Sequence, residues 1–349
     1  MDPLRQPEIG GDRSAANVGR LSLGKIPISV LNRTVLRMRG APTDRILMGP
    51  EAGVDFGVVK LDGQYMIVSS DPITGVSTNI GWYAVNVSAN DVATSGNRPQ
   101  YMESVIMMPK DATEGELAAV AGQIHRSARK VGLSIVGGHT ELTPGLERPI
   151  VVATVFSFAR SYVSSAGAQD GDALLMTKTA GLEGTAVLIR EAERLGIHLD
   201  PSLRGAALRF EAQLSVVPEA VRAFRIGVVH GMHDCTEGGV LGAVYEMSVA
   251  SKTGFELRRA AVPLDPATKR LAKMASLDPI KLIGSGSLIM AVEERLVKRV
   301  LGELSKTCPV AEIGRFRKGK RLLLEPDGSE RLVREAPTDE LWKALARMS

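Results

Sequence analysis

Cysteine and aromatic residues are scarce in this chain. Its 349 residues include two cysteines, Cys235 and Cys308, and aromatic residues make up 4% of it. Two cysteines so far apart do not form a disulfide framework or a cysteine-ligated zinc site, which fits a reducing compartment. No stretch reaches the ~18 consecutive apolar residues of a membrane-spanning helix, and the first twenty residues lack the apolar core of a signal peptide. We therefore expect a cytoplasmic protein with no membrane partner.

The net charge is also low, but its distribution is uneven. The chain has 43 Lys and Arg against 39 Asp and Glu, a formal charge of +4, which is too mild to indicate a nucleic-acid partner. Residues 48–141 nevertheless hold six basic and ten acidic residues, a net −4. An acidic segment inside a basic protein is a natural place for a cation site. Glycine is plentiful, at 36 residues, which is above its usual share of about 7%.

The length predicts two domains. Residues 1–20 are polar and without apolar periodicity, which indicates a mobile arm. Small and polar residues cluster again over 161–172, which indicates a linker. We therefore expect an N-terminal domain over 21–160, a C-terminal domain over 168–325, and a C-terminal tail or helix over 326–349.

Strands and helices alternate in the pattern of a mixed α/β protein. A capping box formed by Thr113 and Glu116 predicts a helix that ends near Gly132, and the next segment, LSIVGG, is expected to be a buried strand that ends in two glycines. The other expected strands are 54–61, 64–70, 101–108, 149–159, 173–179, 287–292, 310–316 and 321–325. The other expected helices lie within 26–38, 80–94, 184–195, 202–224, 239–250 and 293–305.

Four acidic residues share one local context. Each lies at the end or edge of an apolar element, beside Gly, Ser or Thr: Asp55, Asp71, Asp91 and Glu141. Any one of them alone would be an ordinary turn former or helix cap. Together, and without cysteine or histidine partners, they favour a hard cation such as Mg²⁺, which binds through carboxylates and substrate phosphates.

Two glycine pairs have the form of anion sites. Gly137-Gly138 follows an apolar strand and Gly238-Gly239 opens a helix, where backbone N–H groups can approach a phosphate. A flexible turn is the alternative explanation for either pair. His139 and His233 stand inside the same motifs, so each is a candidate for moving a proton. The spacing of His230 and His233 suggests zinc, but no third ligand is evident in the sequence.

Seven short motifs occur in a fixed order between Gly49 and Phe316: GVDFG, SSDPIT, ANDVATSGNRP, GGHTELTPG, GDALLMTKTAGLEG, HDCTEGG and SGSL. In this order they resemble the AIR synthase superfamily, which includes HypE-type hydrogenase-maturation proteins, thiamine-monophosphate kinases and selenophosphate synthetases. The resemblance implies a two-domain AIR synthase-like fold, an ATP and Mg²⁺ site, and a homodimer formed by the N-terminal sheet domain. The C-terminal α/β domain would close over the nucleotide cleft.

The resemblance also assigns roles to individual residues. The metal ligands would be Asp55, Asp71 and Asp91, with Glu141 added from its sequence context. The nucleotide would contact Asn90, Gly137, Gly138, Thr140, Asp234, Thr236, Gly238 and Gly239. Two further roles rest on the residues themselves and not on the resemblance. His139 or His233 would move the proton, and Lys25, in the turn ahead of the first helix, would reach a phosphate if the N-terminal arm folds over the site; a solvated surface lysine is the alternative explanation for Lys25.

Three positions depart from the pattern of the relatives: Val54, His139 and Glu237. HypE proteins modify a C-terminal cysteine, whereas the last residues here, LWKALARMS, contain none. We expect an enzyme that uses ATP to phosphorylate an amide-like oxygen of a small or protein-borne substrate. Two alternatives stay open: a small-molecule kinase like thiamine-monophosphate kinase, and a nucleotide-binding partner protein without turnover.

Overall fold

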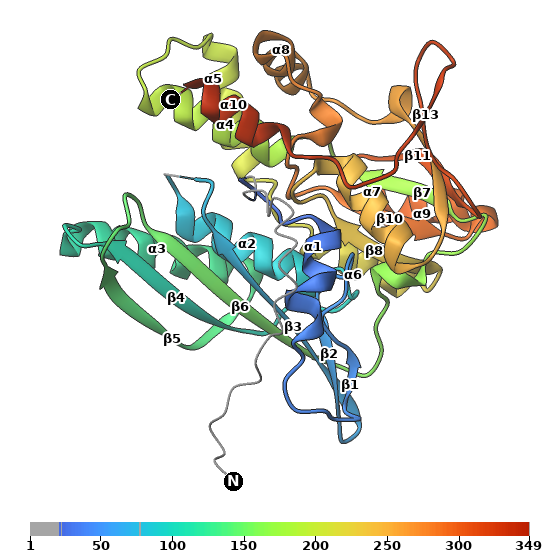
Figure 1. Cartoon of the computed structure of the whole chain (residues 1–349), viewed down its shortest axis with the longest axis horizontal. Helices are drawn as coiled ribbons and strands as arrows, with labels where there is room; N and C mark the ends of the chain where they lie inside the picture. The colour runs from blue at the N-terminus through green and yellow to red at the C-terminus, as the bar shows by residue number, and fades with distance from the viewer. Residues whose placement is uncertain (1–20, 22, 77, 349) are drawn as a thin grey trace, which may run out of the picture.

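Two β-sheets organise the molecule into two lobes (Figure 1). The structure is a computed structural model, and it describes residues 21, 23–76 and 78–348, so the predicted arm over 1–20 lies outside the described residues. The first sheet has the order β1-β2-β3-β6-β4-β5 and the second has the order β13-β12-β9-β11-β7-β10-β8. This arrangement confirms the predicted mixed α/β fold.

The strands of the first sheet are β1 Ile46–Met48, β2 Gly57–Leu61, β3 Gln64–Ile73, β4 Tyr101–Pro109, β5 Ser134–Thr143 and β6 Ile150–Ala159. Those of the second are β7 Ala173–Thr177, β8 Val229–Asp234, β9 Gly254–Arg258, β10 Leu288–Val292, β11 Val310–Arg317, β12 Arg321–Leu324 and β13 Glu330–Leu332. The α-helices are α1 Ile28–Arg33, α2 Ile80–Ala93, α3 Glu114–Val131, α4 Leu182–Arg194, α5 Pro201–Glu211, α6 Val217–Ile226, α7 Gly239–Ala250, α8 Pro266–Ala275, α9 Val297–Leu304 and α10 Glu340–Met348. Short 3₁₀ turns cover Val35–Arg37, Ser165–Gly167, Arg259–Ala261, Pro279–Lys281 and Glu294–Leu296.

Helices α2 and α3 cover one face of the first sheet (Figure 1). The predicted capping box is present, because the Thr113 hydroxyl accepts a hydrogen bond from the Glu116 amide and the Glu116 carboxylate accepts one from the Thr113 amide. Side chains along β6 alternate between buried and half-buried, as expected for a sheet covered on one face. None of the helices in the described part of the chain is long and apolar enough to span a bilayer.

Strand β5 is where the sequence-based expectation was wrong. It was expected to be buried and to end at Gly138, but it continues to Thr143 and is exposed along almost its whole length. The reason is that, among the described residues, it is an edge strand that pairs only with β4. The pairing register skips Val136, which forms a β-bulge. A side chain at Gly138 would lie 2.0 Å from the Ser104 carbonyl oxygen, so glycine permits the close approach of β5 to β4 at this point.

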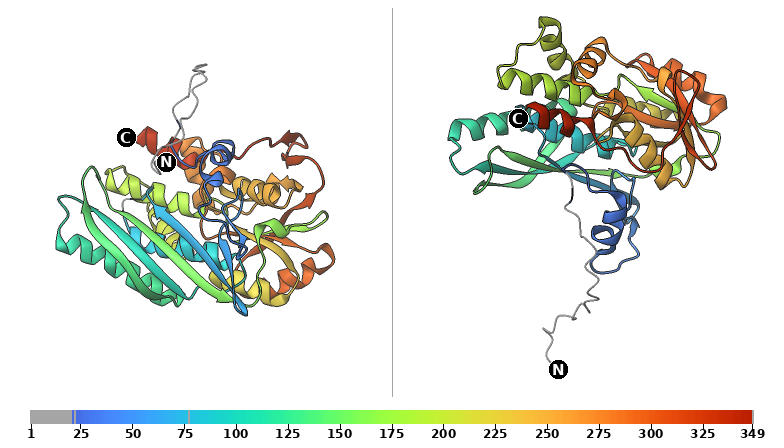
Figure 2. Two further views of the ribbon diagram at one scale, coloured as in Figure 1. Left: turned by 60° about the horizontal axis from the view of Figure 1, so that its bottom comes forward. Right: turned by 45° about the horizontal axis from the view of Figure 1, so that its top comes forward.

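The two lobes share one continuous hydrophobic core, which includes residues of α2, α4 and α6. Polar contacts add to it: the Asn90 side chain donates to the Leu214 carbonyl oxygen at 2.7 Å and accepts from the Val216 amide at 2.8 Å. The C-terminal helix α10 packs beside α4 at the junction, as the right-hand view of Figure 2 shows. The lobes are therefore held together by both apolar packing and buried hydrogen bonds.

Candidate functional site

A cleft of about 680 Å³ lies between the two lobes and is lined by both apolar and polar side chains, many of the polar ones charged. Seven carboxylates line it: Glu51, Asp55, Asp71, Asp91, Glu183, Glu237 and Glu246. The cationic lining residues are Lys25 and Arg148, together with His233. Such an acidic cleft repels an anionic ligand unless cations are bound with it.

Three of the four predicted metal ligands line this cleft from separate elements. Asp55 lies in the loop before β2, Asp71 on β3 and Asp91 on α2. The Ser69 hydroxyl lies 2.7 Å from an Asp91 carboxylate oxygen and 3.3 Å from one of Asp71, so it joins the two acids. Burial, followed by the charge of Asp71, raises the pKa of Asp91 well above its usual value. These carboxylates need a proton or a cation between them.

His233 is the centre of a second cluster in the same cleft. Its Nε2 atom lies 3.0 Å from Asp55 Oδ1 and 3.3 Å from Glu246 Oε2, and its Nδ1 atom lies 2.7 Å from the backbone carbonyl oxygen of Asp234. The Asp234 side chain is fully buried, and neither of its carboxylate oxygens has a hydrogen-bond partner among the described residues. An unpaired buried carboxylate is costly, so Asp234 also requires a proton or a cation.

The pKa values reflect this crowding. Burial lowers the pKa of His233, but the charges of Asp55 and Glu246 outweigh it and raise the value to about 9. Burial raises the pKa of Glu246, but Lys25 and His233 outweigh it and lower the value to about 2. For Asp55, burial dominates and raises the pKa to about 6. Ionisable groups perturbed in this way and gathered in a cleft are typical of functional sites.

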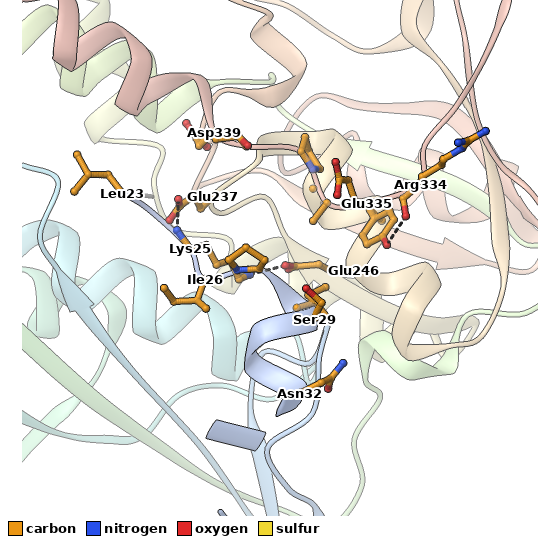
Figure 3. A pocket seen from close by; sticks show the side chains of 17 residues that line it. Leu23, Lys25, Ile26, Ser29, Asn32, Glu237, Glu246, Arg334, Glu335 and Asp339 are labelled. Atoms are coloured by element: carbon orange, nitrogen blue, oxygen red, sulfur yellow. Dashed lines mark hydrogen bonds and ion pairs between the residues drawn. The ribbon is translucent and has the colours of Figure 1, made fainter. Parts of the chain in front are cut away.

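Lys25 reaches the cleft, as its predicted role requires. Its amino group lies 2.6 Å from Glu246 Oε1, and its backbone amide donates to Glu237 Oε1 at 2.6 Å (Figure 3). Trp342 Nε1 donates to the same Glu237 oxygen at 2.8 Å. Lys25, Glu237 and Glu246 also line a second cavity, of about 450 Å³, between α1, α7 and residues 334–339. The chain around Lys25 therefore forms a wall between the cleft and this cavity.

The Gly238 amide, a predicted phosphate contact, already has a partner. It donates to Asp339 Oδ2 at 2.6 Å, so a carboxylate of the C-terminal segment lies at the N-terminus of α7. Gly239 has a packing role, since a side chain there would lie 2.6 Å from the Leu282 carbonyl oxygen. Thr236 lines the cleft. That the two glycines bind phosphate stays a prediction.

Other predicted site residues lie away from this cleft within the single chain. Gly137, Gly138, His139, Thr140 and Glu141 are all on the exposed strand β5. There His139 Nε2 lies 3.1 Å from Glu141 Oε2, so Glu141 is not brought together with the other three acids. Asn90 is buried and both polar ends of its side chain bind the backbone, so in this structure it joins the lobes and does not line the cleft.

Sequence reasoning missed Glu246, Asp339 and Trp342. Glu246 lies in the otherwise apolar helix α7, with the sequence GVLGAVYEMSVA, and a lone acid inside such a helix was a signal that could have found it. Asp339 and Trp342 lie more than 100 residues from their partners in the sequence. No local pattern indicated those contacts.

Comparison with known proteins supports the family resemblance that the seven motifs indicated. Residues 53–159 match the model of the AIR synthase related protein, N-terminal domain, and residues 169–325 match that of the C-terminal domain. The carbamoyl dehydratase HypE of Escherichia coli is 30% identical over 264 residues, which cover 73% of this chain and 76% of that protein. The chain belongs to the AIR synthase-related protein family. Its relatives among characterised proteins include HypE hydrogenase-maturation proteins.

Solved structures share the two-lobed AIR synthase-like fold. A HypE–HypF complex superimposes with a TM-score of 0.73 at 18% identity, covering 88% of this chain and 99% of that one. HypE in complex with ATP gives 0.69 at 22% identity, covering 92% and 98%. A ThiL structure complexed with AMPPCP and TMP gives 0.69 at 16% identity, covering 88% and 94%. At sequence identities of 16–22%, this similarity establishes only the fold of the chain.

Proposed function

We propose that this protein is an ATP- and Mg²⁺-dependent enzyme that phosphorylates an amide-like oxygen of a small or protein-borne substrate, in the manner of HypE. The observation that carries the proposal is the meeting of Asp55, Asp71 and Asp91 in the interlobe cleft. The similarity of the chain to HypE, and the structure of a HypE in complex with ATP, support a nucleotide as the anion that enters this acidic cleft.

The residues present fit Mg²⁺. The three acids offer oxygen ligands, and Asp55 Oδ2 is buried without a hydrogen-bond partner in the part of the chain that the structure describes. When bound, Mg²⁺ would neutralise the charge of the nucleotide phosphates. The chain's own part is to position the reactants: Lys25 lies at the cleft wall, paired with Glu246, and would approach a phosphate by leaving that partner. Transfer of the γ-phosphoryl group to an amide oxygen turns that oxygen into a leaving group.

The acceptor is proposed to be a separate molecule. Cys235 is fully buried, and burial raises the pKa of its thiol well above the usual value. Burial also raises the pKa of Cys308, to about 11. Neither thiol ionises readily at neutral pH, so neither is suited to accept a group. One structural neighbour is a complex of HypE with HypF, and this complex supports including a protein-borne substrate in the proposal beside a small-molecule one.

A homodimer is part of the proposal. Strand β5 has an outer edge that no other described strand pairs with, and it exposes Ile135, Val136 and Leu142, each 46–58% accessible. An exposed apolar edge strand tends to pair with another strand. Such pairing would bury these side chains and would place His139 and Glu141 in the interface or at its margin.

The test is Mg²⁺-dependent ATP turnover by the purified full-length protein, alone and with carbamoylated or amide-bearing acceptors. Asp71→Asn and Asp91→Asn should each lower turnover by at least about 100-fold, as expected for loss of a group that organises transferring phosphate. Asp62→Asn, in the exposed hairpin turn after β2, is the matched control and should leave turnover unchanged.

ATP binding without turnover would favour the non-catalytic alternative, and phosphate retained on an organic product would favour the kinase. No thermal shift with millimolar ATP would contradict all three.

A further inference from the structure

We propose that Glu183 and Ser285 form the subsite that binds the N–H group of the acceptor, and that Glu183 takes the proton of that group. This inference rests on the proposed function and extends it to the second substrate. Both residues line the interlobe cleft from the second lobe, Glu183 in the first turn of α4 and Ser285 in the turn before β10. They belong neither to the proposed Mg²⁺ ligands nor to the predicted nucleotide contacts.

Two buried polar atoms in this part of the cleft lack partners. Glu183 is 5% exposed and Ser285 is 1% exposed. Neither Glu183 Oε2 nor Ser285 Oγ has a hydrogen-bond partner among the described residues. A buried polar atom without a partner is costly, and native structures rarely contain one without a functional reason. We infer that a molecule entering the cleft supplies the missing hydrogen bonds.

The surroundings of Glu183 favour an uncharged N–H donor as that molecule. Four acids interact electrostatically with Glu183: Asp234, Glu237, Asp339 and the Tyr83 hydroxyl. A phosphate group would be repelled by these acids when they are ionised. Within the described part of the chain, Glu183 also belongs to no group of three or more His, Cys, Asp or Glu side chains close enough to share a metal ion. The N–H groups of an amide can donate to both unpaired atoms without adding charge.

The ionisation of Glu183 suits the transfer of a proton. Burial raises the pKa of Glu183 to about 7; the polar groups of the adjacent Ser285 oppose the shift, and the charge of Asp339 adds to it. Near neutral pH the carboxyl group therefore occurs in both forms, so it can accept a proton and release it again.

The proposed step moves one phosphoryl group and one proton. The amide oxygen forms a bond to the γ-phosphorus of ATP, the bond between that phosphorus and the β,γ-bridging oxygen breaks, and ADP leaves with the electron pair. The amide nitrogen gives one proton to the Glu183 carboxylate, and the acceptor becomes an imidate ester of phosphate.

Neighbouring contacts hold the subsite in place. The Gly184 amide donates to the Ile283 carbonyl oxygen at 2.8 Å. The Ser287 hydroxyl donates to the Thr179 carbonyl oxygen at 2.7 Å. The turn before β10 is therefore bound at two points to the chain that leads into and begins α4. Groups held in this way need little rearrangement when an acceptor binds.

The first test measures Mg²⁺-dependent ATP turnover by the full-length protein with amide acceptors, together with its affinity for ATP. Glu183→Gln should lower turnover by at least about 100-fold, as expected for loss of a general base, and should leave ATP affinity unchanged. Ser285→Ala should raise the KM for the acceptor by up to about tenfold, as expected for one lost hydrogen bond, with a smaller effect on kcat. Glu193→Gln is the matched control: Glu193 lies on the same helix, is paired with Arg190, and should leave turnover and affinity unchanged.

The pH profile separates a proton-transfer role from a structural one. Turnover by the unmodified protein should rise with pH through about 7, because the base acts in its deprotonated form. The residual turnover of Glu183→Gln should lack this rise, and Glu193→Gln should retain it.

The second test does not depend on activity. In unmodified protein labelled with ¹³C at the glutamate side-chain carboxyl groups, one resonance should titrate near pH 7, well above the ordinary glutamate value of 4.5. Excess acetamide, used as a small amide probe, should shift this resonance. The resonance should be missing in Glu183→Gln and present in Glu193→Gln.

The outcomes distinguish this inference from the proposed function. Absence of turnover in the unmodified protein contradicts the proposed function, and the labelled resonance then decides the subsite. Turnover or a pH profile that Glu183→Gln leaves unchanged contradicts the subsite alone. A loss of ATP affinity in Glu183→Gln, the absence of a glutamate resonance that titrates near pH 7, or a resonance that acetamide does not move would also overturn it.

Discussion

Gly24 is the residue on which the docking of the Lys25 backbone depends. Its φ angle is +97°, in the left-handed region, and an added Cβ would lie 2.3 Å from Glu237 Oε1 and 2.5 Å from Trp342 Nε1. Glycine therefore serves two purposes here: it permits the backbone conformation, and it leaves room for the hydrogen bonds that converge on Glu237.

Gly24→Ala should separate these two effects when it is compared with Gly40→Ala. Gly40 also has a positive φ, +66°, but an added Cβ meets no atom of the described residues within 4 Å. Both variants should lose about 1–2 kcal/mol of unfolding free energy from the left-handed backbone. Gly24→Ala should lose about 1–3 kcal/mol more, because hydrogen bonds to the Glu237 carboxylate are broken. Urea unfolding measures both, and equal losses would contradict the role of this contact.

Single residues of the site could be predicted from the sequence, but their partners mostly could not. Asp55, Asp71, Asp91 and His233 could be selected from the sequence because each has a distinctive local context. In the structure all four line one cleft. The contact of Lys25 with Glu246 spans 221 residues, and that of Gly238 with Asp339 spans 101. Such pairings are set by tertiary packing, which no local spacing encodes.

The C-terminal segment lies against one side of the site. Asp339 is 1% exposed, and its carboxylate accepts from the amides of Gly238 and Leu341, at 2.6 and 2.7 Å. Burial raises the pKa of Asp339 to about 7; its hydrogen bonds from backbone amides oppose the shift, and the charge of Glu237 adds to it. Helix α10 continues from this residue along α4.

Docking of the segment that contains α10 should weaken as the pH rises. The docked Asp339 holds its proton up to about pH 7, whereas an undocked one loses it near its ordinary value of 3.8. Protonation therefore favours the docked state, and this advantage is lost as the pH rises from about 4 to 7. Hydrogen exchange of residues 339–348, corrected for intrinsic rates, should be faster at pH 8 than at pH 5.5 by about tenfold.

Asp339→Asn should remove this pH dependence, because the amide does not titrate. Asp327→Asn is the control: Asp327 is an exposed acid in the turn before β13, and its carboxylate binds Ser329. It should leave the pH profile of residues 339–348 as it is. A profile that is flat in the unmodified protein, or unchanged in Asp339→Asn, would contradict the assignment.

The elements differ in how well the sequence predicted them. Helices α3 and α7 were placed almost at their observed bounds, since α3 has its capping box and α7 follows a glycine pair. Strand β8 was missed because its sequence, VHGMHD, has few of the β-branched residues by which strands are identified. Strand β5 was identified but its burial was wrong, because apolar composition does not distinguish a central strand from an edge that another chain can cover.

The interlobe cleft is formed where the two lobes join. The shared core and the Asn90 hydrogen bonds fix the lobes to each other, so Asp71 and Asp91 of the first face His233 and Glu246 of the second. The resemblance of the motifs predicted two lobes around a nucleotide cleft. It did not predict that the first lobe would contribute Asn90 as a link between them, because a motif does not separate ligand contacts from packing contacts.

The exposed edge and apolar side chains of β5 lead to a prediction about the whole assembly. If two copies associate through β5, Leu142→Glu should convert the dimer to a monomer, because a carboxylate would be buried in the apolar interface. Leu208→Glu is the matched control: Leu208 lies on α5 and is 63% exposed, compared with 58% for Leu142. Sedimentation equilibrium should give twice the 37.2 kDa chain mass for the unmodified protein and for Leu208→Glu, and the single-chain mass for Leu142→Glu. A dimer that persists in Leu142→Glu, or an unmodified protein that is monomeric, would contradict association through this strand.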